Sequence, residues 1–216
     1  MAKGVSTVPT VVSPPEERMV LRNVSWGTYA RILEDHLDCS SPRFTYDQGV
    51  LEIMTVSAEH EWYNRLISDL VKLLARELRI DLLDLGSATF RRESAKQGFE
   101  PDSCFYVTHA REVRGKERID LEADPPAEIV VEVAVTRPSV SKFPICAAFG
   151  VPEIWTYDGS RLRMYQLSGP EYLEQPFSRV LRGLNANQLS EFLELGKTLD
   201  SLAWPDEVLK RFRSSI

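Results

Sequence analysis

Residues 128–135, with the sequence EIVVEVAV, are the most strand-like segment of the chain. A run of mostly β-branched apolar residues is typical of a strand that is covered on both faces, because neither face can be left in water. Glu132 interrupts the run. Burying its ionised carboxylate would cost several kcal/mol unless the group is paired, protonated or bound to a metal. Two interpretations of Glu132 therefore remain: an ion pair with one of the chain's arginines, or a functional role.

Helical periodicity is strongest over residues 57–80. Ser57 is suited to cap this helix, since its hydroxyl can accept a hydrogen bond from a free backbone N–H. A shorter helix is predicted from Ser25 to about residue 37. The apolar positions that recur at three- and four-residue steps in the long helix are Trp62, Leu66, Ile67, Leu70, Val71, Leu74 and Leu78.

Two β-hairpins are predicted at glycine-containing turns, where glycine supplies a positive φ. Their strands are expected at 43–46 and 50–55, and at 154–157 and 161–167. Other strands are expected at about 82–92 and 102–108, and other helices at about 139–149, 187–195 and 198–213. This order of elements predicts an α/β (α+β) fold, with a central mixed β-sheet flanked by helices around one core.

The chain has 216 residues, enough for one domain with small additions. Residues 1–19 are rich in Pro, Ser, Thr and Val without periodicity, and we expect a flexible N-terminal arm there. A core domain over residues 20–195 and a C-terminal helical extension over 196–216 would complete the chain.

Composition limits the cellular compartment and the kinds of partner that this chain can have. No stretch approaches 18 consecutive apolar residues, which excludes a transmembrane helix from this sequence, and the first residues do not resemble a signal peptide. Cys39, Cys104 and Cys146 form no C-x-x-C pair, so a disulfide framework or zinc site is not expected and a reducing cytoplasm is indicated. The net charge of −6 disfavours a nucleic-acid partner, although bound cations reverse the field of clustered carboxylates.

Asp102 is the second acid of interest. It follows Pro101, which fits the start of a strand, and alternation places Asp102 on the face opposite Phe105. An Asp in this setting is by itself more often a turn residue. Neighbouring strands, however, lie only about 4.8 Å apart, so Asp102 and Glu132 could converge on one ion. Hard oxygen ligands with retained waters are what Mg²⁺ prefers.

Two short motifs, Glu100-Pro101-Asp102 and Glu132-Val133-Ala134, resemble the PD-(D/E)XK nuclease superfamily. Three longer strings resemble one of its members, the restriction-endonuclease family called Uma-two (DUF820-type): GFEPDSCFYV at 98–107, DPPAEIVVEV at 124–133 and KFPICAAFGVPEIW at 142–155. The resemblance covers about residues 22–195. It implies a restriction-endonuclease-like core and an endonuclease that hydrolyses phosphodiester bonds of DNA with Mg²⁺, or with Mn²⁺ as a substitute.

The resemblance also implies roles for individual residues. Asp102 and Glu132 would bind the metal, which polarises the scissile phosphate and activates a water. The lysine usual two residues after the Glu is replaced by Ala134. Lys142 matches the position on the following helix to which the lysine has often moved in this family, and it would orient or deprotonate the water. Glu59 and His60 match positions where relatives often carry a Glu or a His.

Structural interpretations compete with these roles. Lys142 could be a solvated residue of a first helical turn, and His60 a capping or partly exposed histidine. Glu153 is interpreted as architectural and Trp155 as core. Several cations could contact phosphates, although charged loops are more often only solvated. They are Arg91, Arg92, Arg111, Arg114, Lys116 and Arg118.

The leading hypothesis is therefore a cytoplasmic Mg²⁺-dependent endonuclease that acts on DNA. A homodimer is plausible because two symmetric active sites commonly cut the two strands. The first alternative is a catalytically reduced nucleic-acid-binding or regulatory module, which Ala134 favours. The second is an acidic interaction protein without a nucleic-acid role, which the net charge favours.

Overall fold

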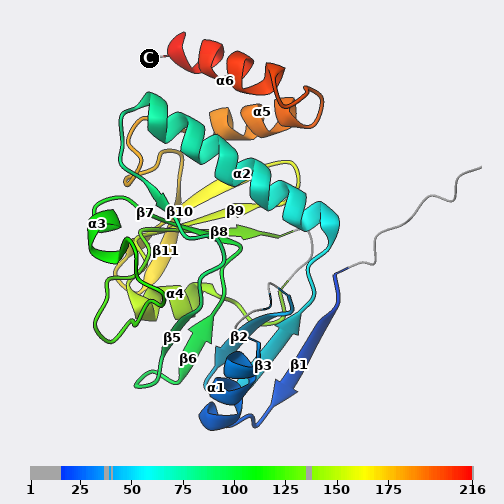
Figure 1. Cartoon of the computed structure of the whole chain (residues 1–216), viewed down its shortest axis with the longest axis vertical. Helices are drawn as coiled ribbons and strands as arrows, with labels where there is room; N and C mark the ends of the chain where they lie inside the picture. Colours follow the sequence, from blue (N-terminus) through cyan, green and yellow to red (C-terminus); the bar gives the residue numbers. More distant parts are fainter. Residues whose placement is uncertain (1–15, 37–38, 40, 135–137, 216) are drawn as a thin grey trace, which may run out of the picture.

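The computed structural model describes residues 16–36, 39, 41–134 and 138–215, which form two β-sheets with helices packed on them (Figure 1). The described helices are α1 (Trp26–Asp35), α2 (Ala58–Glu77), α3 (Ala110–Val113), α4 (Phe143–Phe149), α5 (Ala186–Gly196) and α6 (Ala203–Arg213). No helix in these ranges is both long and apolar enough to cross a membrane.

The larger sheet is the predicted central mixed sheet. Its strands, in spatial order, are β11 (Glu171–Gln175), β10 (Leu162–Ser168), β9 (Glu153–Tyr157), β8 (Ile129–Val133), β7 (Ser103–Tyr106) and β4 (Leu83–Asp84). β8 and β9 run parallel and are connected through α4, whereas the other neighbours are antiparallel. The apolar run predicted as a buried strand is β8, in the interior of this sheet.

The smaller sheet was not predicted as a separate unit. It is antiparallel, with the order β1 (Arg18–Arg22), β3 (Val50–Met54), β2 (Arg43–Asp47), β6 (Gln97–Phe99) and β5 (Phe90–Arg92). Helix α1 packs on it through a cluster of aromatic and aliphatic side chains that includes Tyr29 and Tyr46. The chain passes from this sheet into the larger one between β6 and β7, at residues 100–102.

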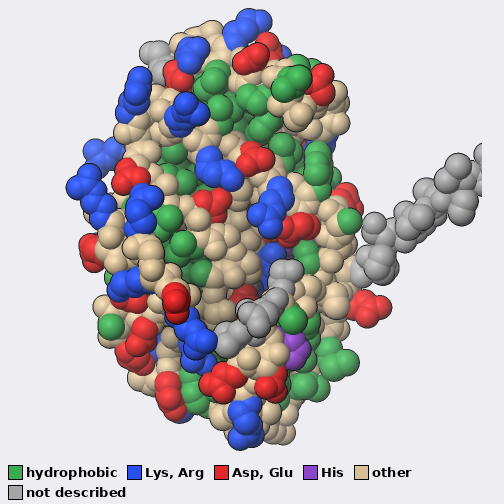
Figure 2. Space-filling model, viewed as in Figure 1, with side chains coloured by type: hydrophobic (Ala, Val, Ile, Leu, Met, Phe, Trp, Pro, Cys, Tyr) green, Lys and Arg blue, Asp and Glu red, His purple; other side chains and the backbone are tan. Residues whose placement is uncertain are grey.

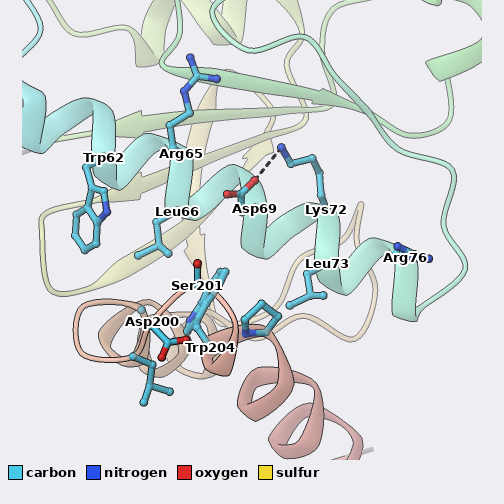
Figure 3. A pocket seen from close by; sticks show the side chains of 13 residues that line it. Trp62, Arg65, Leu66, Asp69, Lys72, Leu73, Arg76, Asp200, Ser201 and Trp204 are labelled. Atoms are coloured by element: carbon cyan, nitrogen blue, oxygen red, sulfur yellow. Dashed lines mark ion pairs between the residues drawn. The ribbon is translucent and has the colours of Figure 1, made fainter.

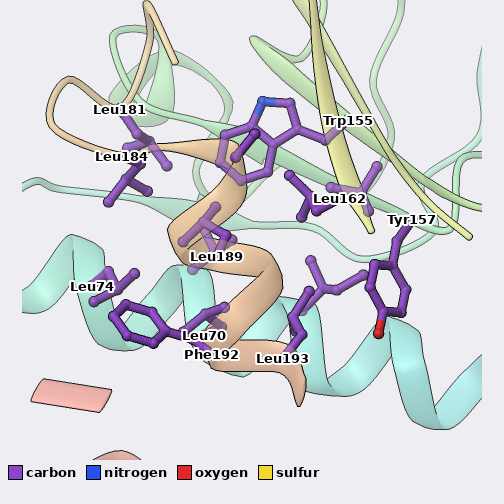
Figure 4. Close-up of a cluster of buried hydrophobic side chains, with 14 of the residues drawn as sticks. Leu70, Leu74, Trp155, Tyr157, Leu162, Leu181, Leu184, Leu189, Phe192 and Leu193 are labelled. Carbon is purple, nitrogen blue, oxygen red and sulfur yellow. The ribbon is translucent and has the colours of Figure 1, made fainter. Parts of the chain in front are cut away.

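The two faces of the larger sheet are covered by different helices. One face packs against α2, α5 and α6, and Figure 4 shows Trp155 and Leu162 of the sheet, Leu189 of α5 and Leu70 of α2 gathered in this cluster. The opposite face packs against α3 and α4 through a second cluster, which contains Cys104, Val130 and Phe149. The predicted coverage of both faces of β8 is therefore confirmed, and Trp155 is a core residue as predicted.

Helix α2 begins as predicted, with the Ser57 hydroxyl accepting from His60 N at 3.1 Å. Its buried face includes His60, Ile67 and Leu74. The inclusion of Trp62 in the buried stripe was wrong, because its side chain lies at the margin of that face and is 44% exposed.

Several element boundaries differ from prediction. Both hairpins form around Gly49 (φ 98°) and Gly159 (φ 90°), as predicted. The single strand expected at 82–92 is instead β4 and β5, which belong to different sheets. The helices expected from residues 139 and 198 begin later, at Phe143 and Ala203. Strands β1, β6 and β11 were not predicted.

The remaining expectations concern the two ends of the core domain. Residues 1–15 of the expected arm and Val135 lie outside the described residues, and residues 18–19 are part of β1. In the C-terminal segment, Trp204, Val208 and Phe212 of α6 belong to the same buried cluster as the sheet.

Candidate functional site

Asp102 lies where the chain enters the larger sheet, directly before β7. Its backbone N–H donates to Val131 O at 3.2 Å, and the next residue, Ser103, is in register with Val131 of β8. The carboxylate bends toward β8, where Oδ2 accepts from Val133 N at 2.6 Å. Asp102 therefore lies at the start of β7, against the neighbouring strand β8 that carries Glu132.

Glu132 is the only acid within β8, and its carboxylate is partly satisfied. Oε2 lies 2.7 Å from Lys142 Nζ. Oε1 is buried and has no hydrogen-bond partner in the described part of the chain. A buried carboxylate oxygen without a partner is unusual, because desolvation costs free energy that no contact returns.

Lys142 is held in place at the start of α4. Its ammonium group donates to Glu132 Oε2 and, at 2.8 Å, to the carbonyl oxygen of Glu100, and it lies 5.9 Å from the centre of the Phe99 ring. Only 10% of the side chain is exposed. The interpretation of Lys142 as a solvated helix residue was therefore wrong.

His60 is fully buried between two carboxylates, in the first turn of α2. Nδ1 pairs with Glu16, and Nε2 is 2.9 Å from Asp102 Oδ1, although the ring is not aligned for a hydrogen bond there. Burial alone would lower the pKa of His60, but Asp102 and Glu16 outweigh it and raise the pKa to about 9. The interpretation of His60 as a capping or partly exposed side chain was wrong.

Arg43, in β2, supplies a second cation to Asp102 and was missed in the sequence. Its guanidinium donates to Asp102 Oδ1 and to Pro101 O, and it lies 3.4 Å from Glu61 Oε2. Asn64 of α2 donates to Asp102 O at 2.9 Å. No local sequence pattern marks Arg43, whose contact with Asp102 joins positions 59 residues apart.

The two candidate acids differ in charge environment. Burial tends to raise the pKa of Asp102, but His60, Arg43 and Lys142 together hold it well below its usual range. Burial also raises the pKa of Glu132, and the negative charge of Asp102 raises it further, against the opposing effect of Lys142. Asp102 is thus held as the anion, whereas Glu132 takes up a proton more readily than a glutamate in water does.

Glu52 is a further buried acid that the sequence analysis missed. In β3 it pairs with Arg18 at 3.0 Å, and Oε2 accepts from Ser139 N at 2.7 Å and Val140 N at 3.2 Å. It therefore anchors Ser139 and Val140, which precede α4. A signal was present, because Glu52 interrupts the apolar strand VLEIM just as Glu132 interrupts its own.

Other predicted residues lie elsewhere. Glu59 is exposed, and its carboxylate accepts from Tyr63 OH at 3.2 Å rather than joining Asp102. Glu153 is buried and accepts from the backbone N–H groups of Arg179 and Val180, which agrees with its interpretation as architectural. Of the cations expected at phosphates, Arg114 pairs with Asp81 and Lys116 with Asp124.

The donor set fits a divalent ion that keeps most of its water. Within the described ranges no three His, Cys, Asp or Glu side chains surround one point. Two carboxylates are present, and Glu132 Oε1 is an unused hard oxygen. Mg²⁺ usually binds through one or two carboxylates and several waters. Asp102 and Glu132 would be the two carboxylates of such a site, with the Asp102 oxygens also accepting from Arg43 and Val133 N–H, whereas a closed zinc site would need more ligands.

Comparisons with known proteins identify the family. A solved structure, described as "Crystal structure of a putative nuclease belonging to DUF820 from Anabaena variabilis ATCC 29413", is similar with a TM-score of 0.50 and 13% identity. The match covers 74% of this chain and 98% of that one, and it concerns the fold. No curated protein matches the sequence. The family Uma2, described as "Putative restriction endonuclease", matches residues 26–201, and the chain belongs to it.

Proposed function

We propose that this protein is a divalent-metal-dependent endonuclease that hydrolyses phosphodiester bonds of DNA. The observation that carries the proposal is the unpartnered buried oxygen Oε1 of Glu132, beside the ionised Asp102 and the fixed ammonium of Lys142. Membership of a family of restriction-endonuclease-like proteins supports phosphodiester hydrolysis as the reaction class.

In this proposal the residues have distinct tasks. Asp102 and Glu132 hold Mg²⁺ or Mn²⁺, which when bound polarises the phosphate and lowers the pKa of a water. Lys142 presents its ammonium group next to Glu132, where it orients the attacking water and offsets negative charge that develops on the phosphate. Arg43 and His60 keep the Asp102 carboxylate charged and fixed in direction.

The test is plasmid cleavage by the purified protein in Mg²⁺ or Mn²⁺, with EDTA as a control. Asp102→Asn and Glu132→Gln keep the shape of each side chain but remove its charge, and both should abolish metal-dependent cleavage. Glu191→Gln, at an exposed position of α5, is the matched control and should cleave normally. Normal cleavage by Asp102→Asn or by Glu132→Gln would refute the assignment of the site.

A second candidate is a nucleic-acid-binding module that has lost efficient turnover. It is favoured by the occupation of Asp102, because Arg43 and Val133 N–H already engage its two oxygens, and by Ala134 in place of the usual lysine. Salt-sensitive DNA binding by a folded protein that cleaves no plasmid in either metal would select this candidate.

A further inference from the structure

A row of cations follows one exposed line of helix α2. Arg65, Lys72 and Arg76 are separated by seven and then four residues, so they lie within about 40° of one another around the helix axis. The row spans about 16 Å at 1.5 Å per residue. Arg79, in the turn after the helix, extends it. Figure 2 shows Lys and Arg side chains distributed across the face of the molecule on which α2 lies.

These cations have no strong internal partners. Arg65 pairs with Glu61 of its own helix. Lys72 pairs with Asp69 of its own helix and, at 3.6 Å, with Asp84 of β4. The side chains of Arg65 and Lys72 are 73% and 49% exposed. Across the described ranges, Arg76 and Arg79 take part in no ion pair. Because exposed pairs contribute little to stability, the row is available to an external anion.

The row of cations on α2 lies between two hollows in the surface. On one side is a groove of about 570 Å³ between α2 and α6, with Leu66, Leu73 and Trp204 in its lining (Figure 3). On the other side is a hollow of about 430 Å³ that Lys72, Arg76 and Arg79 border. The cations therefore form a ridge that an elongated ligand can follow.

One end of the row reaches the candidate site. Arg65 Nε bonds to Glu61 at 2.7 Å, and Glu61 in turn lies against Arg43, which holds Asp102. Arg65 also lines a hollow of about 420 Å³ together with Glu100, whose carbonyl oxygen accepts from Lys142. An anion lying along α2 would thus point toward Asp102 and Glu132.

We infer that this row on α2 binds the sugar-phosphate backbone of the DNA substrate and directs it to the site. The inference rests on the proposed function. It offers a way for a chain of net charge −6 to bind a polyanion, since charges farther from the ligand than a Debye length of about 8–10 Å are largely screened by salt.

The test compares Lys72→Gln and Arg76→Gln with matched controls. Lys210→Gln, in α6, removes a lysine that pairs with an acid three residues away, as Lys72 does. Arg31→Gln, in α1, removes an exposed helical arginine without an ion pair in the described chain, as for Arg76. Binding to a fluorescein-labelled DNA duplex is measured by anisotropy in Ca²⁺ buffer over a series of salt concentrations.

Each α2 substitution should weaken binding for every DNA sequence and should lower the slope of log K against log salt by about 1, since one phosphate contact is lost. The controls should keep the wild-type slope. Wild-type slopes in both α2 variants, or equal losses in the controls, would overturn the inference and leave the nuclease intact. A wild-type protein that neither binds nor cleaves DNA would overturn the proposed function itself.

Discussion

The side chain of Glu153 bonds strand β9 to residues 178–180, which are distant in the sequence. Its Oε1 accepts from Arg179 N and, at 3.0 Å, from Val180 N, and its Oε2 accepts from Ser178 Oγ at 2.8 Å and Trp155 Nε1 at 3.0 Å. A buried carboxylate satisfied by several donors is structural, because its loss would leave all of these donors without a partner.

Glu153→Ala should therefore reduce the free energy of unfolding by roughly 3–5 kcal/mol. Urea denaturation followed by circular dichroism measures the change, with Glu191→Ala as the exposed control. A loss below about 1 kcal/mol would show that water replaces the carboxylate at little cost.

Lys142→Ala should separate chemistry from metal binding. If the ammonium group acts on the water and the phosphate, cleavage should slow by about 10²–10³, as for the loss of one transition-state contact. Calorimetric titration with Mn²⁺ should show a smaller change in affinity. A large loss of Mn²⁺ affinity with a normal rate at saturating metal would assign Lys142 to the metal site instead.

The site was only partly predictable at this scale. Glu132 could be recognised in the sequence because it is an acid within an apolar strand, and Glu52 carried the same signal. Arg43 and Glu16 carried no such signal, because an arginine at the first position of a strand and an acid in a Pro-rich segment are ordinary surface residues in a sequence. Their burial follows from contacts across 59 and 44 positions, which no local pattern contains.

Among the elements, the β9–β10 turn depends on a single carboxylate. Asp158 accepts from Ser160 N at 3.0 Å and Arg161 N at 2.8 Å, and it pairs with Arg163 at 2.7 Å. Burial tends to raise the pKa of Asp158, but these donors outweigh it and hold the pKa well below its usual range.

Asp158→Asn should consequently cost about 1–2 kcal/mol near neutral pH. A depressed folded-state pKa gives stability that is complete above the unfolded pKa of about 3.9 and disappears as the pH falls through the folded value. The difference between wild type and variant should shrink below about pH 4. Urea unfolding at a series of pH values measures it, and a difference independent of pH would contradict the assignment.

Elements with strong periodicity or turn chemistry were predictable. Helix α2, the two hairpins and the end of α4 at Gly150 (φ 79°) follow from such signals. β6 was not, because Gln-Gly-Phe is too short to alternate. β11 is a largely exposed edge strand, so burial left no mark on its sequence.

At the scale of the whole molecule, the C-terminal helix completes the main core. Trp204, Val208 and Phe212 of α6 are buried against the cluster that also contains β8 and α2. Since each such side chain contributes about 1.5–3 kcal/mol when buried, α6 supplies a large share of a typical total of about 5–15 kcal/mol.

Deletion of residues 202–216 should therefore lower the free energy of unfolding by at least about 4 kcal/mol. Thermal and urea unfolding of the truncated chain measure the loss, and the single substitution Leu202→Ala, at a side chain that is 83% exposed, is the control. An unchanged denaturation midpoint would show that residues 202–216 are an independent extension.

The division of the strands into two sheets could not be predicted from the sequence. Each strand shows its own alternation, but its partner is fixed by pairing over long separations, as between β2 and β6. The layer order was predictable because the apolar β8 required cover on both faces. The position of the hairpin at 43–54 in a second sheet was not.

The spread of the main core along the chain bears on synthesis in the cell. The strands that carry Asp102 and Glu132 pack on Leu181, Leu189 and Phe212, which the ribosome makes much later. A growing chain therefore contains both acids well before it contains the layer that holds their strands in place. The proposed nuclease activity would accordingly be absent from nascent fragments and would arise only after the residues of this layer have been translated.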